Sequence, residues 1–560
     1  MKSQITVFLL SLLIGQLLAI QINSDQLPFG KADKTAFPTF TVYQNSDNGY
    51  IVKPVKDTTG IAYAVFSNEM MTTGWGYLSI TTNSSYSDLT QAAGAGYLEG
   101  FITQEMIWQN WVNMYVNEYH KTIGQDVQNW ITSNIQYMDA QINANPTDPY
   151  WTHISLIWTQ LTSMVSGYND ANTDSSTSLQ LLDFLLMNMD GDMIDLGPAL
   201  NLSSSTQTKE FNPKVRFTEF MRKTGHCSAL IKLADDLSDL YSAHVTWSSF
   251  YEMSRIFKVY NFGYKNPAAS KITMFSSYPA TLSSIDDFYL LDTKITVIET
   301  TNGLMNNNLY PLITPNSVLS WIRVIVANRM ATDGNSWCQV FEKYNSGTYN
   351  NQWIIVDYNK FTPGVSVRDG TLFILEQIPG YCEYADNTDI LLTGYFGSYN
   401  IPRYEYIFNI SGFNDTSAYG NWFSYTASPR AEIFRRDANN VHDLAQMQAM
   451  IRYNNWAKDP LSLGNAGNQI SSRFDLVTHD DPSNQYLNPD AFGGIDGKVV
   501  NYQYVQNLLV AAQSGPTHDQ VAPFDWTQNG GVWSSKYTHV GMPDRWDFGW
   551  ATMSVETMDY

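Results

Sequence analysis

The spacing of apolar residues changes along this chain, and the changes predict where strands and helices lie. Short apolar and aromatic runs at residues 61–66 and 76–80 are typical of strands. Residues 98–119 and 154–168 instead carry apolar residues at helical spacing and lack proline, so we expect two long helices there. Asp174 to Thr177 supplies residues that favour a helix N-terminus, which predicts a third helix over 179–189.

After residue 227 the pattern shifts toward strands separated by helices. The expected strands are residues 295–300, 352–358 and 371–376, and the expected helices are residues 317–330 and 440–453. Strands and helices in blocks predict a layered α+β fold with a largely antiparallel sheet. Residues 479–497 are rich in Asp, Asn, Pro and Gly, so we expect mostly loop in that segment.

The first residues have the features of a secretory signal peptide. Lys2 supplies a positive charge, residues 5–20 are almost wholly apolar, and Leu17-Leu18-Ala19 suits cleavage, so we expect a signal peptide over residues 1–19. No later stretch approaches about 18 uninterrupted apolar residues, which predicts no transmembrane segment. We therefore expect a secreted protein or one of the lysosomal lumen.

Glycosylation signals and net charge agree with that route. Four Asn-x-Ser/Thr triplets predict glycosylation, at Asn83, Asn201, Asn409 and Asn414. The chain has 32 basic and 53 acidic residues, a net charge of −21. This charge argues against nucleic acid or an anionic membrane surface as a standing partner.

Three cysteines allow at most one disulfide bridge within the chain. Cys338 and Cys382 are the natural pair, which would leave Cys227 as an odd thiol in an oxidising compartment. One interpretation is that Cys227 is a small buried hydrophobic residue. The other is that Cys227 becomes the first residue of a mature chain, where its thiol and a free α-amine would form a nucleophile with its own base.

Several common catalytic signatures are missing from the sequence. It has no G-x-S-x-G, H-E-x-x-H or C-x-x-C motif, and no G-x-G-x-x-G follows a strand. We therefore expect no metal and no cofactor. Three His-Asp pairs are interpreted as turn residues rather than catalytic groups: His442-Asp443, His479-Asp480 and His518-Asp519.

The neighbourhood of Cys227 is more informative. Residues 225–228 are small and polar, as in a turn, and an apolar run begins at Ala229. Residues 243–250 form a second strand-like run that contains His244 and Trp247. Two strands joined by a loop would place His244 or Trp247 near the start of the first strand.

At these residues the chain resembles the phospholipase B-like proteins, a group within the N-terminal-nucleophile hydrolases. The matching stretches run in order across about 300 residues. They are HCSALIKL at 226–233, HVTWSSF at 244–250, FSSYPATLSSIDDFYLL at 275–291, IETTNG at 298–303, KYNSGTYNNQWIIVDY at 343–358, LEQIPG at 375–380, SPRAEIFRR at 428–436 and GPTHDQVAPFDW at 515–526.

The resemblance implies a fold and a maturation step. The fold would be a four-layer αββα sandwich of the N-terminal-nucleophile hydrolase type, with two stacked, largely antiparallel sheets. The precursor would be cut between His226 and Cys227. An N-terminal fragment, 20–226, with strands followed by a helical segment, and a C-terminal fragment, 227–560, which carries the nucleophile, would together form one compact catalytic unit.

The resemblance also implies roles for other residues. His244 and Trp247 would be pocket residues beside the nucleophile, although a satisfied core pair is the alternative. Thr301 would line the pocket, with Thr300 hard to exclude. Asn400 would stabilise an oxyanion. Arg430 would orient the nucleophile or its neighbours, and its alternative is a structural salt bridge.

Three functions follow from these expectations. The first is a secreted or lysosomal hydrolase that removes fatty acyl chains from glycerophospholipids through Cys227, with transient contact to a membrane surface. The second is an amidase that uses the same site on N-acyl lipids or small amides. The third is a lumenal lipid-binding protein that processes itself but does not turn over substrate.

Overall fold

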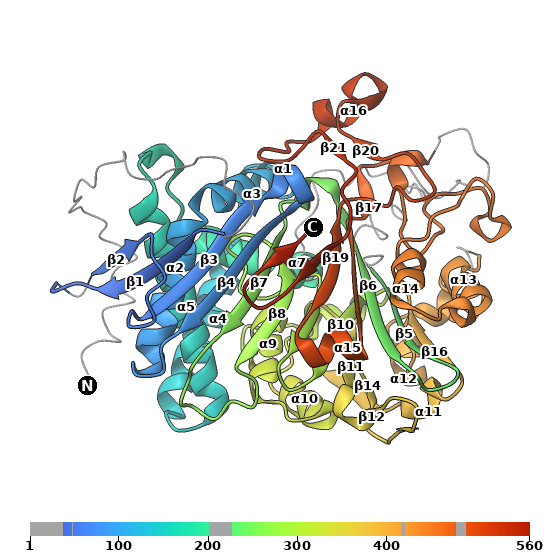
Figure 1. Ribbon diagram of the computed structural model, residues 1–560, viewed down its shortest axis with the longest axis horizontal. Coiled ribbons are helices and arrows are strands. Elements are labelled where there is room, and N and C mark those ends of the chain that lie inside the picture. Colours follow the sequence, from blue (N-terminus) through green and yellow to red (C-terminus); the bar gives the residue numbers. More distant parts are fainter. Residues whose placement is uncertain (1–36, 48, 201–226, 417–419, 478–488) are drawn as a thin grey trace. The chain divides into compact units, whose positions relative to one another are not determined.

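Two large β-sheets organise the chain between Pro38 and Tyr560, which forms one compact unit. The computed structural model describes residues 37–47, 49–200, 227–416, 420–477 and 489–560. The α+β class expected from the sequence is confirmed, since large sheets and many helices share this unit (Figure 1).

The larger sheet has eleven strands in the described residues. In spatial order they are β15 (Tyr381–Asp386), β14 (Leu372–Ile378), β11 (Asn351–Asp357), β10 (Ile295–Thr301), β9 (Phe288–Leu291), β8 (Ile272–Ser277), β7 (Ile256–Asn261), β4 (Trp75–Thr82), β3 (Ala62–Glu69), β1 (Thr39–Gln44) and β2 (Tyr50–Lys53). Among the described strands, β4 and β7 pair in parallel and the other neighbours pair antiparallel. The β4–β7 ladder therefore joins the strands before the helical segment to those after it.

The smaller sheet carries Cys227. In spatial order its strands are β16 (Tyr395–Ser398), β5 (Cys227–Leu233), β6 (Leu240–Ser249), β18 (Asp496–Asn501), β19 (Val510–Ser514), β22 (Ala551–Met553) and β23 (Met558–Asp559), and β17 (Phe492–Gly494) also pairs with β6. Two further ladders are short: β12 (Phe361–Thr362) with β13 (Ser366–Val367), and β20 (Phe524–Asp525) with β21 (Arg545–Trp546).

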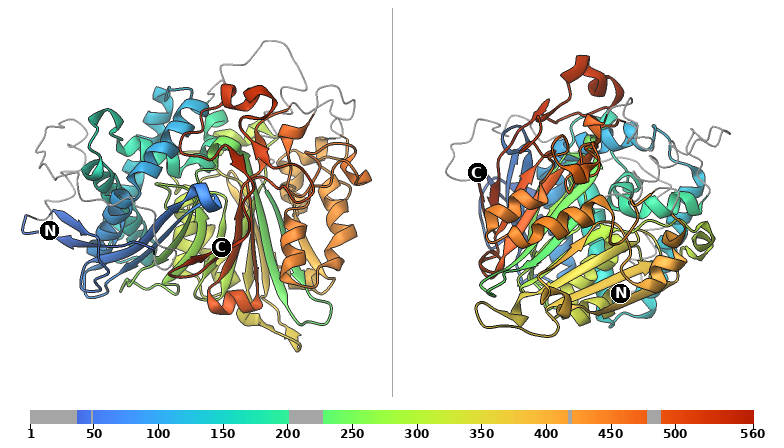
Figure 2. Two further views of the ribbon diagram at one scale, coloured as in Figure 1. Left: turned by 45° about the horizontal axis from the view of Figure 1, so that its top comes forward. Right: turned by 90° about the vertical axis from the view of Figure 1, so that its right-hand side faces the viewer.

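The two sheets face each other through polar contacts. The Tyr77 hydroxyl on β4 donates to the Ser554 carbonyl at 2.8 Å, beside β22. Ser242 on β6 and Tyr358, just after β11, share a hydroxyl–hydroxyl hydrogen bond of 2.8 Å. The views in Figure 2 show the sheets stacked, with helices outside them.

Helices cover the outer face of each sheet. Beside the larger sheet lie α1 (Met70–Thr73), α2 (Asp88–Ile102), α3 (Gln104–Asn117), α4 (Gln125–Ala144), α5 (Pro149–Ala171), α6 (Leu181–Asn188), α7 (Asp190–Ala199), α9 (Ser320–Met330) and α10 (Gly334–Phe341). Beside the smaller sheet lie α13 (Pro429–Asp437) and α14 (Leu444–Ile451). The remaining helices are α11 (Thr388–Leu391), α12 (Glu405–Ile410), α15 (Tyr502–Asn507) and α16 (Gln528–Lys536).

Helices α2 and α5 approach each other closely because glycines line their contact. A Cβ added at Gly96 would lie 1.9 Å from the Gln160 carbonyl oxygen, and one at Gly167 would lie 2.1 Å from the Tyr97 carbonyl oxygen. A side chain larger than hydrogen at either position would push the helices apart.

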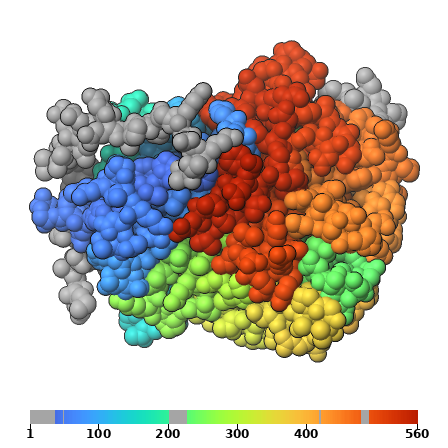
Figure 3. All heavy atoms as spheres, viewed as in Figure 1, coloured from blue at the N-terminus to red at the C-terminus, as the bar shows by residue number. Residues whose placement is uncertain are grey.

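The C-terminal segment lies between regions that are distant in sequence. In Figure 3 it runs across the molecular face, between the N-terminal strands on one side and residues after 400 on the other. Ser79 on β4 donates to the Val555 carbonyl at 2.7 Å, so the last strands are fixed to the larger sheet. The structure has no helix in its described residues that is both long and apolar enough to cross a membrane.

Three predictions of local secondary structure were wrong in part, two for helices and one for a loop. The helix predicted over 98–119 is two helices, α2 and α3, because the backbone leaves helical geometry at Thr103, with φ −106° and ψ 14°. Asp174 caps a single 3₁₀ turn rather than the following helix, which begins at Leu181.

The segment expected to be loop, 479–497, also contains regular structure. Its residues 478–488 lie outside the described part of the chain, but Phe492–Gly494 and Asp496 belong to strands. Pairing with β6 overrides the local turn composition there.

Candidate active site

Cys227 is the first residue of β5, and its side chain lies in the interior with 1% of its surface exposed. In the β5–β6 ladder, Cys227 lies opposite Thr246, and Ala229 lies opposite His244. The Cys227 thiol lies 3.5 Å from Oε1 of Glu299 on β10 of the facing sheet. Burial, and then the neighbouring Glu299 carboxyl, raise the pKa of the Cys227 thiol well above its usual range.

Both backbone groups of Cys227 contact residues expected at the site. Its N–H donates to Oδ1 of Asn400 at 3.5 Å. Its carbonyl oxygen accepts from Nη1 of Arg430 at 2.6 Å, and the same Nη1 donates to Oδ1 of Asn400 at 2.8 Å. Asn400 has a positive φ of 66°, a conformation that asparagine adopts more readily than most residues. The nitrogen of Cys227 is thus held by an acceptor oxygen.

Arg430 holds backbone groups rather than a carboxylate. It lies in the first turn of α13, its guanidinium lies 4.3 Å from the centre of the Trp247 ring, and its Nη2 donates to the Tyr399 carbonyl at 2.7 Å. No Asp or Glu among the described residues lies within ion-pair distance of Arg430. Burial lowers the pKa of Arg430 to about 9. The structure therefore does not contain the salt bridge considered as the alternative for this residue.

Thr301 rather than Thr300 contacts the cluster around Cys227. The Thr301 hydroxyl donates to Oε2 of Glu299 at 3.3 Å, and its carbonyl accepts from Nδ2 of Asn400 at 2.9 Å. The Thr300 hydroxyl instead shares a 2.6 Å hydrogen bond with Ser398. Because Nδ2 of Asn400 is already bound to a carbonyl, an oxyanion role for Asn400 stays a prediction.

His244 completes the cluster with a neutral ring. It is fully buried, and neither ring nitrogen has a hydrogen-bond partner among the described residues. Burial, and then the Lys498 ammonium, lower the pKa of His244 well below its usual range. A side-chain donor atom from each of Cys227, His244 and Glu299 lies within 4.8 Å of the others. The nearby Lys498 ammonium disfavours a metal ion at this position.

Glu299 lies at the centre of the Cys227 cluster, and the sequence analysis did not predict it. Its carboxyl also accepts from the Tyr349 hydroxyl at 3.2 Å. Burial, and then the nearby Asp287, raise the pKa of Glu299 well above its usual range. Burial likewise raises the pKa of Asp287 to about 8. The sequence did carry a signal for Glu299, since this residue is charged but lies inside the apolar run 295–300, and a buried charge needs a partner.

Four buried charges lie beside Thr246, the residue opposite Cys227 in the β5–β6 ladder. Arg255, just before β7, and Lys498 on β18 each contact both Asp286 and Asp496. Lys498 also donates to the Thr246 hydroxyl at 2.6 Å, and the Thr246 N–H donates to Asp496 at 2.9 Å. The charges of the two cations and the two carboxylates balance. Their ion pairs connect the two sheets next to Thr246, which lies opposite Cys227. Sequence reasoning did not predict this four-charge cluster.

Other predicted positions lie apart from the cluster or outside the described residues. His226, Asn201, the 1–19 segment and His479-Asp480 are outside the described part of the chain. Asn409 and Asn414 are exposed, and Asn83 is half-buried, with its Nδ2 donating to the Thr58 carbonyl. Asp443 caps α14, and His518 contacts the Pro516 carbonyl.

The bridge considered between Cys338 and Cys382 is not formed in the structure. Both residues are free thiols, Cys338 on α10 and Cys382 on β15. Burial raises the pKa of Cys382 to about 12.

Comparison with known proteins identifies the family of this chain. Residues 62–553 match a family model described as Phospholipase B. The chain belongs to the phospholipase B family. It is 63% identical to phospholipase B-like protein A of Dictyostelium discoideum over 533 residues, which cover 93% of this chain and 92% of that protein.

Animal relatives are more distant but cover much of the chain. It is 40% identical over 518 residues to putative phospholipase B-like 2 of Mus musculus, covering 87% of this chain and 84% of that protein. The human protein of the same name is 39% identical over 518 residues, with 87% and 85% covered. Membership in the family confirms the resemblance drawn from the motifs.

Proposed function

We propose that this family member is a secreted or lysosomal acyl hydrolase that removes fatty acyl chains from glycerophospholipids, with Cys227 as an N-terminal nucleophile. One observation carries the proposal: the thiol, N–H and carbonyl of Cys227 each contact a different polar residue in a buried cluster. A structural cysteine needs no such set of contacts. The names of the relatives support lipid as the substrate class.

The first step of the proposal is cleavage of the chain by its own thiol. Sγ of Cys227 attacks the carbonyl carbon of His226, and the bond from that carbon to the Cys227 nitrogen breaks. The thiol proton goes to that nitrogen, which leaves as an α-amine. Water then hydrolyses the thioester, which gives a carboxylate on His226 and restores the thiol. Arg430 and Asn400 keep the Cys227 backbone in place during these steps.

The same groups then act on substrate. Sγ attacks the ester carbonyl carbon while the α-amine takes the thiol proton, and the amine passes this proton to the departing alcohol. Water hydrolyses the acyl thioester, which releases a fatty acid and restores the thiol. An α-amine has a reference pKa of about 8, so it accepts the proton near neutral pH. Oδ1 of Asn400 is positioned to accept a hydrogen bond from this amine.

The fold supports two fragments that stay together after the cut. Strands β1–β4 precede the cut site, and β7–β11, β14 and β15 follow it, yet both groups form one sheet through the parallel β4–β7 ladder. Two facing sheets with helices outside are what the N-terminal-nucleophile hydrolase type requires.

One observation favours the non-catalytic alternative. The Cys227 side chain is almost wholly buried in the uncut chain, so a lipid ester has no direct access to the thiol. A protein that cleaves itself and keeps this site closed would bind lipid without turnover. The test must therefore measure cleavage and lipid hydrolysis separately.

The experiment compares the wild-type chain with Cys227→Ala and Cys227→Ser. Mass spectrometry of the secreted protein should show a new N-terminus at Cys227 in wild type and an intact chain in Cys227→Ala. The mature wild type should release fatty acid from a diacyl phospholipid, and an N-acyl amide assayed beside it tests the amidase alternative. Cys338→Ala, at a buried thiol outside the site, is the matched control and should keep both activities.

The outcomes distinguish the alternatives. A wild-type chain without a new N-terminus at Cys227 would refute the mechanism. A cleaved protein that releases fatty acid from neither substrate supports the lipid-binding alternative. Faster hydrolysis of the amide than of the ester would make the protein an amidase.

A further inference from the structure

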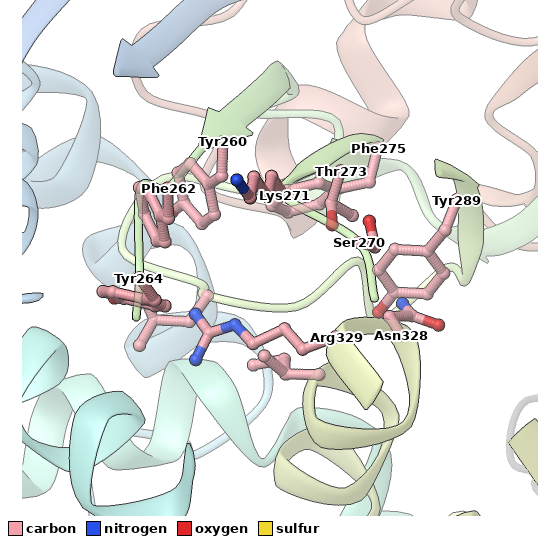
Figure 4. Close-up of a pocket in the computed structure, with 12 residues that line it drawn as sticks. Tyr260, Phe262, Tyr264, Ser270, Lys271, Thr273, Phe275, Tyr289, Asn328 and Arg329 are labelled. Atoms are coloured by element: carbon pink, nitrogen blue, oxygen red, sulfur yellow. The ribbon is translucent and has the colours of Figure 1, made fainter. Parts of the chain in front are cut away.

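A second polar site lies in a cavity that none of the Cys227 cluster lines. The cavity has a volume of about 30 Å³ and lies where the ends of β7 and α9 meet the start of β8. Five aromatic rings line it, those of Tyr260, Phe262, Tyr264, Phe275 and Tyr289 (Figure 4). Its size suits a few small atoms rather than a whole lipid.

Arg329 at the end of α9 brings a positive charge to this cavity. Its side chain is 92% buried, because only 8% of its surface is exposed. Its guanidinium lies 5.2 Å from the centre of the Tyr264 ring and 5.7 Å from that of Phe262. In Figure 4 the Arg329 side chain extends toward Tyr264. Arg329 is therefore held by ring faces on one side of the cavity.

The hydrogen bonds of Arg329 are incomplete. Nη2 donates to Oε1 of Gln160 at a long 3.5 Å, and Nη1 has no partner among the described residues. No carboxylate in the described part of the chain lies within 4 Å of the guanidinium. The Tyr264 hydroxyl, also buried and also a lining residue, has no partner there either. Nδ2 of Asn328, another buried lining residue, has no partner there as well, so three buried donors lack acceptors at one cavity.

The surrounding ionisable groups do not balance the charge on Arg329. Burial, and then Arg329 itself, lower the pKa of His153 to about 4, so that ring is neutral at higher pH. Glu99 is matched by Lys258 at 2.7 Å. Asp88 accepts backbone N–H groups of residues 265 and 266. Lys271, which lines the cavity and is exposed, adds positive charge.

A buried cation normally has a partner, because removal from water penalises an isolated charge. Aromatic faces attract a guanidinium but accept no N–H···O hydrogen bond in its plane. Water would supply an acceptor without supplying charge. An anion supplies both, and Arg is well suited to the two oxygens of a carboxylate.

We propose that the Arg329 cavity binds a small carboxylate anion, whose oxygens contact the Arg329 guanidinium and whose short carbon chain lies against the aromatic rings. The Tyr264 hydroxyl supplies a second donor. A simple halide would satisfy the charge but would not use the rings. This site is independent of the catalytic proposal, because it shares no residue with the Cys227 cluster.

The experiment follows thermal unfolding of the full secreted chain during titration with sodium butyrate. Butyramide, which has the same carbon skeleton without charge, and sodium chloride are run at equal ionic strength. The variants are Arg329→Met, which keeps an unbranched chain of similar length, and Arg368→Met, an exposed control.

We expect butyrate to raise the Tm of wild type and of Arg368→Met along a saturating curve, because a ligand that binds only the folded state stabilises it. Butyramide should leave Tm unchanged. Arg329→Met should lose the butyrate response and should be at least as stable as wild type without butyrate, since it removes an unpaired buried charge.

The contrary outcomes are also defined. An unchanged wild-type Tm in butyrate, or an equal rise in Arg329→Met, overturns the site. An equal rise with chloride that Arg329→Met abolishes overturns the carboxylate class. If Arg329→Met does not fold, Arg329→Lys replaces it, and its apparent Kd for butyrate should be at least about tenfold weaker because the paired N–H donors are lost.

Discussion

The Arg430 guanidinium donates a 2.6 Å hydrogen bond to the carbonyl oxygen of Cys227, although the two residues are 203 positions apart. The same nitrogen also holds Asn400, which in turn accepts from the Cys227 N–H. Arg430 therefore fixes the backbone on which the thiol would act, and it is a positioning residue in the proposed mechanism.

Replacing Arg430 with Gln should slow self-cleavage by at least tenfold. A hydrogen bond to a charged group contributes roughly 1.5–3 kcal/mol, and about 1.4 kcal/mol is a factor of ten in rate. Pulse-chase labelling with electrophoresis would measure the cleavage rate. Arg435→Gln, an exposed position on the same helix, is the control. Far-UV circular dichroism and Tm separate a slower reaction from misfolding, and cleavage of a folded Arg430→Gln at the wild-type rate would refute the role.

Replacing Glu299 with Gln should shift the pH profile of self-cleavage to lower pH. The pKa of Glu299 is raised well above its usual range, so its carboxyl becomes charged only toward the upper end of the pH range, where it raises the pKa of the Cys227 thiol. A neutral amide has no such effect there. The thiolate would then form at lower pH. Cleavage rates measured from pH 4 to 9 on purified precursor give the profile, with the exposed Glu405→Gln as control. An unshifted profile would show that Glu299 does not influence the thiol.

The four-charge cluster should be strongly coupled. Lys498→Met leaves Asp286 and Asp496 with less positive charge in the interior, and breaking a buried ion pair typically costs about 3–5 kcal/mol. Asp496→Asn together with Lys498→Met should cost less than the sum of the two single changes. Urea unfolding measures each free energy.

The control for this double-mutant comparison is an exposed ion pair. Lys56 and Glu556 form a 3.1 Å ion pair with 42% and 50% of their side-chain surfaces exposed, so Lys56→Met should cost less than about 1 kcal/mol. Strict additivity of the Lys498 and Asp496 changes would contradict the coupling.

Asp195 on α7 should make the folded chain less stable as pH rises. Burial raises the pKa of Asp195 to about 7, above the value of about 3.9 for an exposed carboxyl. Between these values the folded state holds more protons than the unfolded state, so its stability falls with rising pH. Asp195→Asn should remove up to about 1.4 kcal/mol per pH unit of that slope.

Unfolding by urea at pH 5, 6 and 7 would measure the slope for wild type, Asp195→Asn and the exposed Asp369→Asn. The lowered pKa of His153 contributes the opposite slope below about pH 6.5. That contribution is common to all three chains and cancels in the comparison. Equal slopes in wild type and Asp195→Asn would refute the assignment.

The local pattern of apolar residues was sufficient to predict many helices and strands, but not where each begins and ends. The run 295–300 became β10, and 154–168 lies within α5. The helix over 98–119 divided at Thr103, where the backbone leaves helical geometry, and the periodicity of apolar residues does not report such a local change of φ and ψ. The strands in 489–497 were missed because a neighbouring strand, β6, supplies their hydrogen bonds.

The sequence by itself determined that a strand lies next to Cys227, near His244 and Trp247, and its motifs determined the family. It was wrong in assigning Cys227 and Ser228 to a turn, because pairing with β6 makes them the first residues of β5. Only the tertiary structure decided that Glu299, 72 residues away, faces the thiol and that Asn400, 173 residues away, faces the nitrogen. The periodicity of apolar residues encodes which side of one element is buried. It does not encode the order of strands in two sheets or how these sheets stack, and those two arrangements bring Glu299, Asn400 and Arg430 to Cys227.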